Sequence, residues 1–188
     1  MPAPGPVVWA PPPPRRPGPA PGLEYAGFWI RTGAYLIDAI PLIIAAVIVF
    51  IPLITAMASA MASIPYPSGA SFYSPEYAAY NKAVTQAMVD AMPGFYPAMA
   101  LLQVVSAAYF VGFWTWRGQT PGMMAVGLRV ARDRDGTPPG LSRAILRYVG
   151  YIVSWFSLFI GFFWVGADAR KQGWHDKIAS TVVVRRIG

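Results

Sequence analysis

Cysteine is absent from this sequence, and histidine occurs once, as His175. The absence of cysteine excludes disulfides, thiolate metal sites and catalysis by a thiol. A single histidine cannot form a metal site by itself. The sequence also contains neither a Gly-x-Gly-x-x-Gly motif nor a Walker-type phosphate loop, so nothing in it indicates nucleotide binding. We therefore expect no metal and no cofactor.

Charged residues are scarce, at 12% of 188 positions, whereas 55% of the positions are hydrophobic. This balance is too apolar for an ordinary soluble domain of this length and indicates an integral membrane protein with one membrane domain. The net charge of +7 does not indicate nucleic-acid binding, because the basic residues flank apolar segments and form no patch interleaved with aromatic residues. We expect the lipid bilayer as a partner and no nucleic acid.

The first 22 residues are proline-rich and of low complexity. This composition predicts a disordered cytoplasmic head with polyproline II character, outside a membrane domain at residues 23–188. Prolines 11–14 followed by Arg15 and Arg16 are also compatible with docking on an aromatic groove of a partner. The composition favours a solubilising tether over docking.

An apolar segment at residues 25–50 is long enough to cross a bilayer, yet it contains Arg31 and Asp38. A hydrocarbon core of about 30 Å requires roughly 20 mainly apolar residues in a helix. Arg31 lies one turn inside the expected boundary, where its long side chain can reach the headgroups. Asp38 is predicted near the midplane, where a carboxylate needs a partner, a proton or water. It is either a hydrogen-bond hub that ties helices together or a site of transport or ion coupling.

Two further apolar segments follow. Residues 91–116 carry no charge and predict a second span, with Trp114 and Trp116 at its inner end. Residues 148–167 form the third segment, and a single crossing there would put the basic tail outside, against the positive-inside rule. We therefore favour a broken or re-entrant hairpin near Gly161 over a plain third span. The predicted fold is an all-α multi-pass membrane protein with spans at about 28–55, 95–116 and 145–167, an outer loop at 59–94, an inner loop at 117–144 and an inner tail at 168–188.

Short elements are expected on both sides of the membrane. On the inner side, residues 128–130 lead to an Asp-Gly turn and could pair as a strand with the TVVV sequence at 181–184. On the outer side, the alanine-rich residues 76–92 predict an amphipathic helix lying on the interface, with a partner-binding cap as the alternative.

Three blocks of the sequence resemble one family: AGFWIRTGAYLID, GQTPGMMAVGLRV with an acidic-Gly turn after it, and WHDKIASTVVV. They are similar to the RDD family of bacterial membrane proteins, which is named for one arginine and two aspartates. The resemblance covers residues 25–186 and identifies these positions as Arg31, Asp38 and Asp176. It implies a multi-pass protein of the bacterial cell membrane, with transport of an unidentified ligand proposed and cation/proton exchange attributed to some members. The outer loop is long for the family.

Asp176 follows His175 after the third apolar segment, among several basic residues. We expect Asp176 to pair with Arg31 at the inner boundary, since an arginine in a membrane helix needs a partner. That pairing leaves Asp38 to Arg147, water or a transported cation. The alternative is a tail held only by local contacts, and His175 is interpreted as a packing or interface residue.

Two functions from different classes remain. The first is a small transporter or transporter component that uses the intramembrane Arg/Asp pair for proton or cation coupling. Because two or three spans hardly enclose a pathway, a homo-oligomer is expected. The alternative is a non-catalytic accessory or scaffold subunit of a larger membrane complex. An enzyme is not expected, since the sequence offers no paired carboxylates, activated nucleophile or metal cluster. Both termini are predicted to be cytoplasmic.

Overall fold

The computed structural model describes residues 17–187. The proline-rich head predicted at residues 1–22 falls mainly outside the described residues. Its last six residues form an ordered turn instead, because the N–H of Gly18 donates to the carbonyl oxygen of Leu23 at 2.7 Å. Along the chain the elements are β1 (Leu23–Tyr25), α1 (Phe28–Ala62), α2 (Pro75–Arg117), α3 (Pro121–Ala125), β2 (Leu128–Arg132), α4 (Gly140–Phe156), α5 (Ile160–Ala167), α6 (Trp174–Ile178) and β3 (Thr181–Arg186).

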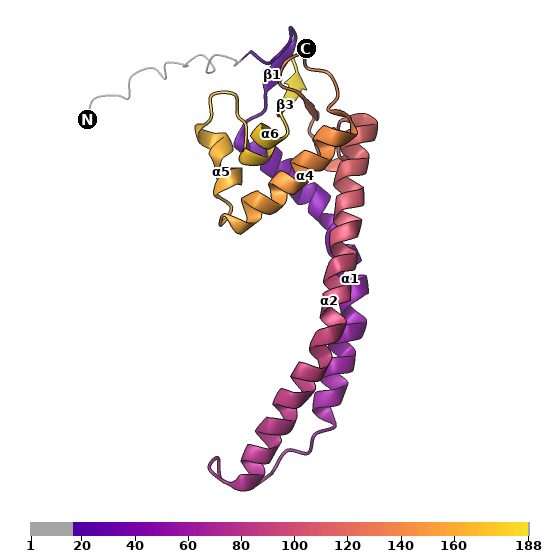
Figure 1. Cartoon of the computed structure of the whole chain (residues 1–188), viewed down its shortest axis with the longest axis vertical. Coiled ribbons are helices and arrows are strands. Elements are labelled where there is room, and N and C mark those ends of the chain that lie inside the picture. Colours follow the sequence, from indigo (N-terminus) through magenta and orange to yellow (C-terminus); the bar gives the residue numbers. More distant parts are fainter. Residues whose placement is uncertain (1–16, 188) are drawn as a thin grey trace, which may run out of the picture.

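Two long helices dominate the molecule. Helix α1 has 35 residues and α2 has 43, which at about 1.5 Å per residue gives lengths of about 52 and 64 Å. They run side by side as an antiparallel hairpin that extends away from the rest of the chain (Figure 1). Both are long and apolar enough to cross a membrane.

The long outer loop predicted at 59–94 is wrong, because only residues 63–74 connect the two helices. Ser74 caps the start of α2 by accepting a hydrogen bond from the N–H of Tyr77, and Pro75 occupies the first turn, where its missing N–H costs nothing. The predicted helix at 76–92 is present, but it continues into the second apolar segment. Pro93 and Pro97 lie inside α2 without ending it.

The third apolar segment is broken, as predicted. Helices α4 and α5 meet at an angle of 103° across residues 157–159, just before Gly161. Leu158 and Phe159 have φ angles of 52° and 64°, which no α-helix can contain. Gly161 then packs against Ser154, where a Cβ would collide with the hydroxyl. The bent pair is apolar enough to be a third span or a re-entrant hairpin.

A small antiparallel sheet joins distant parts of the chain in the order β1-β3-β2. The predicted pairing is confirmed, with Val130 opposite Val183. Strand β1 was not predicted and corrects the expected all-α class; it pairs Tyr25 with Val184 directly before α1 begins. The sheet therefore fixes the start of α1 beside the C-terminal strand.

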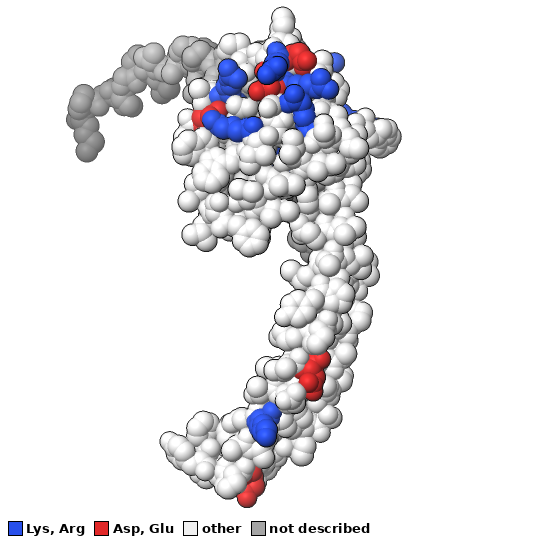
Figure 2. Space-filling model, in the orientation of Figure 1, with Lys and Arg blue, Asp and Glu red and all other residues white. Residues whose placement is uncertain are grey.

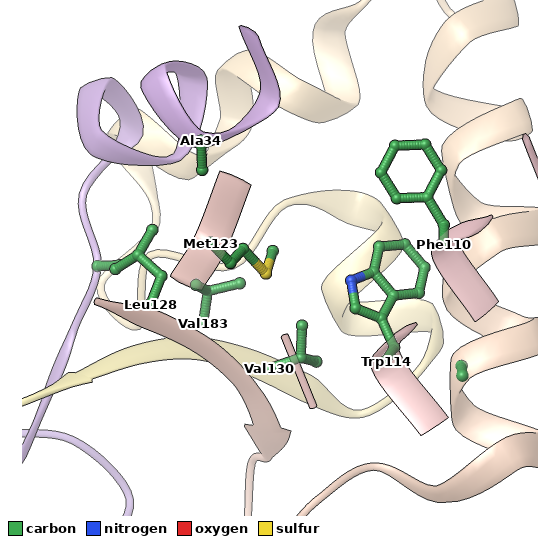
Figure 3. Packing of buried hydrophobic residues seen from close by; sticks show 9 residues of the cluster. Ala34, Phe110, Trp114, Met123, Leu128, Val130 and Val183 are labelled. Atoms are coloured by element: carbon green, nitrogen blue, oxygen red, sulfur yellow. The ribbon is translucent and has the colours of Figure 1, made fainter. Parts of the chain in front are cut away.

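The hydrophobic core lies where the sheet meets the long helices. Figure 3 shows Met123 and Val183 between Ala34 of α1 and Trp114 of α2, with Leu128 and Val130 contributed by β2. We call this part of the molecule, made of the sheet, α3 to α6 and the adjoining ends of α1 and α2, the packed end. Lys and Arg side chains gather on it, and few charges lie on the rest of the hairpin (Figure 2).

Candidate functional site

Asp176 on α6 lies between two arginines and is fully buried. Its Oδ2 accepts a hydrogen bond from Nη1 of Arg31 at 2.6 Å, and its Oδ1 accepts one from Nη1 of Arg147. The backbone N–H of Gly173 adds a third, at 3.0 Å. We call Arg31, Arg147 and Asp176 the Arg–Asp centre. The predicted pairing of Arg31 with Asp176 is confirmed. Of the three partners considered for Asp38, namely Arg147, water and a transported cation, Arg147 is ruled out because it binds Asp176 instead.

The two arginines bind further groups that connect α1 and α4 to the sheet region. Arg31 donates from Nε to the carbonyl oxygen of Ala26 at 3.0 Å, at the start of α1. Arg147 donates to Oγ1 of Thr181 at 3.0 Å, and its guanidinium lies 4.9 Å from the ring centre of Trp114. Cation–π contact with a tryptophan stabilises a guanidinium that is held away from water. The centre thus fixes α1, α4, α6 and β3 relative to one another.

Burial keeps His175 neutral and leaves the centre with a net positive charge. The ring of His175 packs edge-on against Tyr151, with ring centres 4.5 Å apart. Burial is the main cause that lowers the pKa of His175 to about 3; Asp176 opposes this shift, and Arg147 and Arg31 add to it. Burial raises the pKa of Asp176, but Arg147 and Arg31 outweigh it and hold that pKa below its usual value. With Asp176 ionised and His175 neutral, the centre carries a formal charge of +1.

Asp38 lies in a separate cage of neutral donors. Its Oδ1 accepts hydrogen bonds from the hydroxyl of Tyr109 at 2.8 Å and the N–H of Gly122 at 2.7 Å, and its Oδ2 accepts one from Thr120 at 2.5 Å. We call Asp38, Tyr109, Thr120 and Gly122 the Asp38 cage. Within residues 17–187, no basic group lies within 4.0 Å of this carboxylate.

The cage is built by the loop that follows α2. Thr120 caps α3, which turns the chain back under α1 and brings its first residues against Asp38. Gly122 is required there because a Cβ would collide with the carbonyl oxygen of Ala34 and with the carboxyl group of Asp38. Asp38 therefore lies beside the loop that follows Arg117. Its predicted depth near the membrane midplane stays a prediction.

A chamber of about 300 Å³ lies next to both sites. The Arg–Asp centre contributes Arg31 and Arg147 to its wall, and the Asp38 cage contributes Asp38. His175 also lines it, and most of the remaining lining is aromatic or aliphatic. The chamber lies among α1, α2, α4 and α5, and its lining includes Phe28, Tyr35, Phe110, Met123, Tyr151, Trp155, Phe159, Phe162, Phe163 and Val165.

Comparison with known proteins identifies the family. The family model described as the RDD family matches residues 25–180, which is most of the chain. The chain belongs to the RDD family. A relative from Bacillus subtilis (strain 168), named "Uncharacterized protein YxaI", is 34% identical over 161 residues, which are 85% of this chain and 96% of the relative. "Uncharacterized protein RP437" from Rickettsia prowazekii (strain Madrid E) is 32% identical over 82 residues, covering 44% of this chain and 45% of that protein. No solved structure matches the chain.

Family membership and the apolar helices together indicate a membrane protein. In this RDD protein, the arginine and the two aspartates expected from the resemblance do not meet at one point. Arg31 and Asp176 are in contact, while Asp38 is held separately by its cage. The chamber connects the two.

Several residues of the site were not predicted from the sequence. Tyr109, Thr120 and Gly122 bind Asp38, and Thr181 binds Arg147. In the GQTPG sequence at 118–122, glycine beside a short helix start is the local signal of a close backbone approach. A buried carboxylate requires hydrogen-bond donors, and this requirement could have linked that loop to Asp38.

Proposed function

We propose that this chain is a multi-pass protein of the bacterial cell membrane that acts as a small transporter, or as a component of one, and binds its ligand in the chamber. The observation that carries this proposal is that one chamber is bounded by Arg31, Arg147 and Asp38. Ionisable groups around a cavity within a membrane domain mark ligand or ion pathways. Enclosing a continuous pathway with so few spans requires more than one copy, so we expect a homo-oligomer.

The distribution of charge supports an orientation in which the packed end lies in the cytoplasm. Lys and Arg gather at the packed end, where β1 and β3 pair and hold the two ends of the described chain on the same side (Figure 2). The positive-inside rule places this end in the cytoplasm. The connection at residues 63–74 carries no charge and then lies outside.

Asp38 is the candidate for proton or cation coupling. Two of its three donors are hydroxyls, on Tyr109 and Thr120, and a hydroxyl can rotate from donating to accepting. Asp38 can therefore exchange its charge for a proton, or bind a cation, through rotation of two side-chain groups while the N–H of Gly122 remains in place.

Flux measurements in proteoliposomes test this proposal. Vesicles with a trapped pH indicator and an imposed pH gradient are given Na⁺ or K⁺ outside. We expect the native chain to collapse the gradient at least ten times faster than protein-free vesicles, and Asp38→Asn to lower the rate to that background. Asp90→Asn is the matched control, because Asp90 is exposed near the far end of the hairpin. Equal rates for the native chain and Asp38→Asn would end the coupling role.

Because the substitution replaces one accepting carboxylate oxygen with an NH2 group that can only donate, Asp38→Asn must first be shown to keep the native melting temperature. Tyr109→Phe provides a second test that leaves the carboxylate in place. It removes one donor from a partly buried position, so we expect an altered flux rate at constant pH with the fold retained.

An accessory or scaffold subunit is the second candidate. Its support is that the Asp38 and Asp176 carboxylates are both bound by protein groups, as cross-links between helices would be. Copurification in mild detergent separates the two candidates. A stoichiometric larger partner that is lost when residues 63–74 are replaced by a Gly-Ser linker, or when residues 1–22 are deleted, favours the scaffold. A homogeneous homo-oligomer favours the transporter.

A further inference from the structure

The chamber has an apolar body and a basic wall. Arg147 lines it with only 1% of its surface exposed, and its Nε is buried without a hydrogen-bond partner among residues 17–187. An unpaired buried donor on a charged group is costly, and an anionic oxygen is the partner that offsets that cost best. Nδ1 of His175, which also lines the chamber, is buried without a partner in the described part of the chain as well. At Arg147 the unpaired group is a donor, and it calls for an acceptor.

The charge on one wall of the chamber agrees with an acidic ligand head. The Arg–Asp centre carries a formal charge of +1, because two guanidinium groups share one carboxylate. Neutral His175 adds nothing to that charge. On the other wall, the carboxylate of Asp38 already accepts three hydrogen bonds from its cage. The positive charge that a ligand could neutralise therefore lies on the wall formed by Arg147 and Arg31.

The mouth of the chamber opens on an apolar surface. Trp155, Phe159 and Phe163 line the chamber and are still 59%, 41% and 64% exposed. Trp155 lies on α4, Phe163 lies on α5, and Phe159 lies in the break between them. From Tyr148 to Ala167 this segment carries no charged residue. The charged side chains lie at the sheet side of the packed end (Figure 2). A hydrocarbon chain can therefore enter from the lipid without crossing water.

We propose that the chamber holds one acyl chain of an amphiphile whose acidic head lies against Arg147. A fatty acid and an acidic phospholipid share this chemistry. The volume of about 300 Å³ lies at the small end of the range for ligand pockets, which suits a single chain. The proposal shares with the transport proposal only the chamber as the binding site.

Photo-crosslinking tests the head group on the native chain. The full chain is placed in nanodiscs of a zwitterionic phospholipid and exposed to a diazirine analogue of palmitic acid or to the corresponding alcohol. We expect at least fivefold more adduct from the acid, located on α4 and α5 around Trp155 and Phe159. Equal labelling by the alcohol would overturn the proposal. Adducts located only on the parts of α1 and α2 that lie far from the packed end would overturn it as well.

A pair of matched substitutions tests the chamber itself. Thr32 lines the chamber on α1, whereas Thr55 is exposed on the same helix and lies outside it. Thr32→Trp fills the chamber and is expected to lower labelling at least fivefold, while Thr55→Trp leaves it unchanged. Thr32→Trp with native labelling and an unchanged melting temperature would rule the chamber out. If Thr32→Trp fails to fold, the comparison of acid and alcohol on the native chain still tests whether the site prefers an acidic head group.

Two further arms identify the source of the ligand and separate this proposal from transport. A diazirine phosphatidic acid is compared with the free acid; labelling by either supports the site, and the stronger label names the source. Acid-dependent labelling without any Asp38-dependent flux would end the transport proposal and leave the acyl site in place. Asp38-dependent flux without acid-dependent labelling would end the acyl-site proposal and leave the transport proposal in place.

Discussion

At the scale of single residues, the molecule places two aspartates in different environments. Asp176 is ionised between Arg31 and Arg147, whereas Asp38 is bound by two hydroxyls and one backbone N–H. A buried carboxylate between two cations stabilises the fold chiefly because its loss would leave those cations uncompensated. The two arginines and Asp176 therefore do not contribute equally to stability.

Neutralising Asp176 is expected to destabilise the protein more than removing Arg31. Asp176→Asn leaves two buried guanidinium groups without an anion and should cost about 3–5 kcal/mol. Arg31→Met keeps the pair of Asp176 with Arg147 and should cost about 1.5–3 kcal/mol, the typical loss for hydrogen bonds to a charged group. Thermal unfolding of both variants in the same detergent measures the difference. An Arg31→Met variant that melts below Asp176→Asn would contradict the +1 charge assigned to the centre.

His175 should make stability depend on pH between 7 and 5. Its pKa is lowered to about 3 in the folded protein by burial, against an ordinary value of 6.5, so the unfolded chain binds a proton first as pH falls. Stability is thus complete above pH 6.5 and is lost below it, by up to about 1.4 kcal/mol per pH unit. Melting temperatures at pH 7, 6 and 5 should fall for the native chain and stay flatter for His175→Gln. Parallel slopes for the two would show that another group titrates.

At the scale of elements, the apolar segments could be predicted and their boundaries could not. The two long helices and the break at 157–159 follow from hydropathy and the positive-inside rule. Both depend only on the order of apolar and basic residues along the chain. The outer loop was wrong because residues 76–92 and 91–116 were predicted as two separate elements, whereas α2 continues through Pro93 and Pro97 as one helix. Strand β1 was missed because three residues beside an apolar helix have no pattern of their own until β3 pairs with them.

Helix α3 shows why the Asp38 cage could not be predicted from the sequence. Its contact with α1 depends on a close backbone approach at Gly122, and no local pattern specifies the partner of such a glycine.

Gly122→Ala should separate α3 from α1 and open the Asp38 cage. The added methyl group collides with the carbonyl oxygen of Ala34 and with Asp38, so we expect a loss of about 1–3 kcal/mol, as for other overpacked sites. Gly112→Ala is the matched control in α2, where nothing lies within 4 Å of the new Cβ. That control should be neutral or stabilising by up to about 1 kcal/mol, since alanine favours a helix. Chemical or thermal unfolding measures both, and equal effects would place the constraint elsewhere.

At the scale of the whole molecule, one packed end carries the sheet, both sites and most of the charge, while the long hairpin carries few charged groups. The sheet joins residues 23–25, 128–132 and 181–186, so the start of α1, the loop after α2 and the tail must lie on one side. From the sequence, the pairing of β2 with β3 and the contact of Arg31 with Asp176 were predictable, because both follow from placing the tail on the inner side.

The chamber was not predictable, since it depends on how the bent pair α4–α5 packs against α1. Sequence patterns specify which segments are apolar, but the angle between two packed helices is set by side-chain contacts across several elements.

The topology itself is testable because the chain has no native cysteine to remove. Ser71 lies exposed in the connection between α1 and α2, and Arg186 lies exposed at the end of β3. In intact cells, a membrane-impermeant maleimide should label Ser71→Cys and leave Arg186→Cys unlabelled until the membrane is permeabilised. The basic packed end faces the cytoplasm in this arrangement, and the hairpin carries its tip to the other side. Labelling of Arg186→Cys without permeabilisation would reverse the orientation, and equal labelling of both positions from outside would mean that α1 and α2 do not cross the membrane.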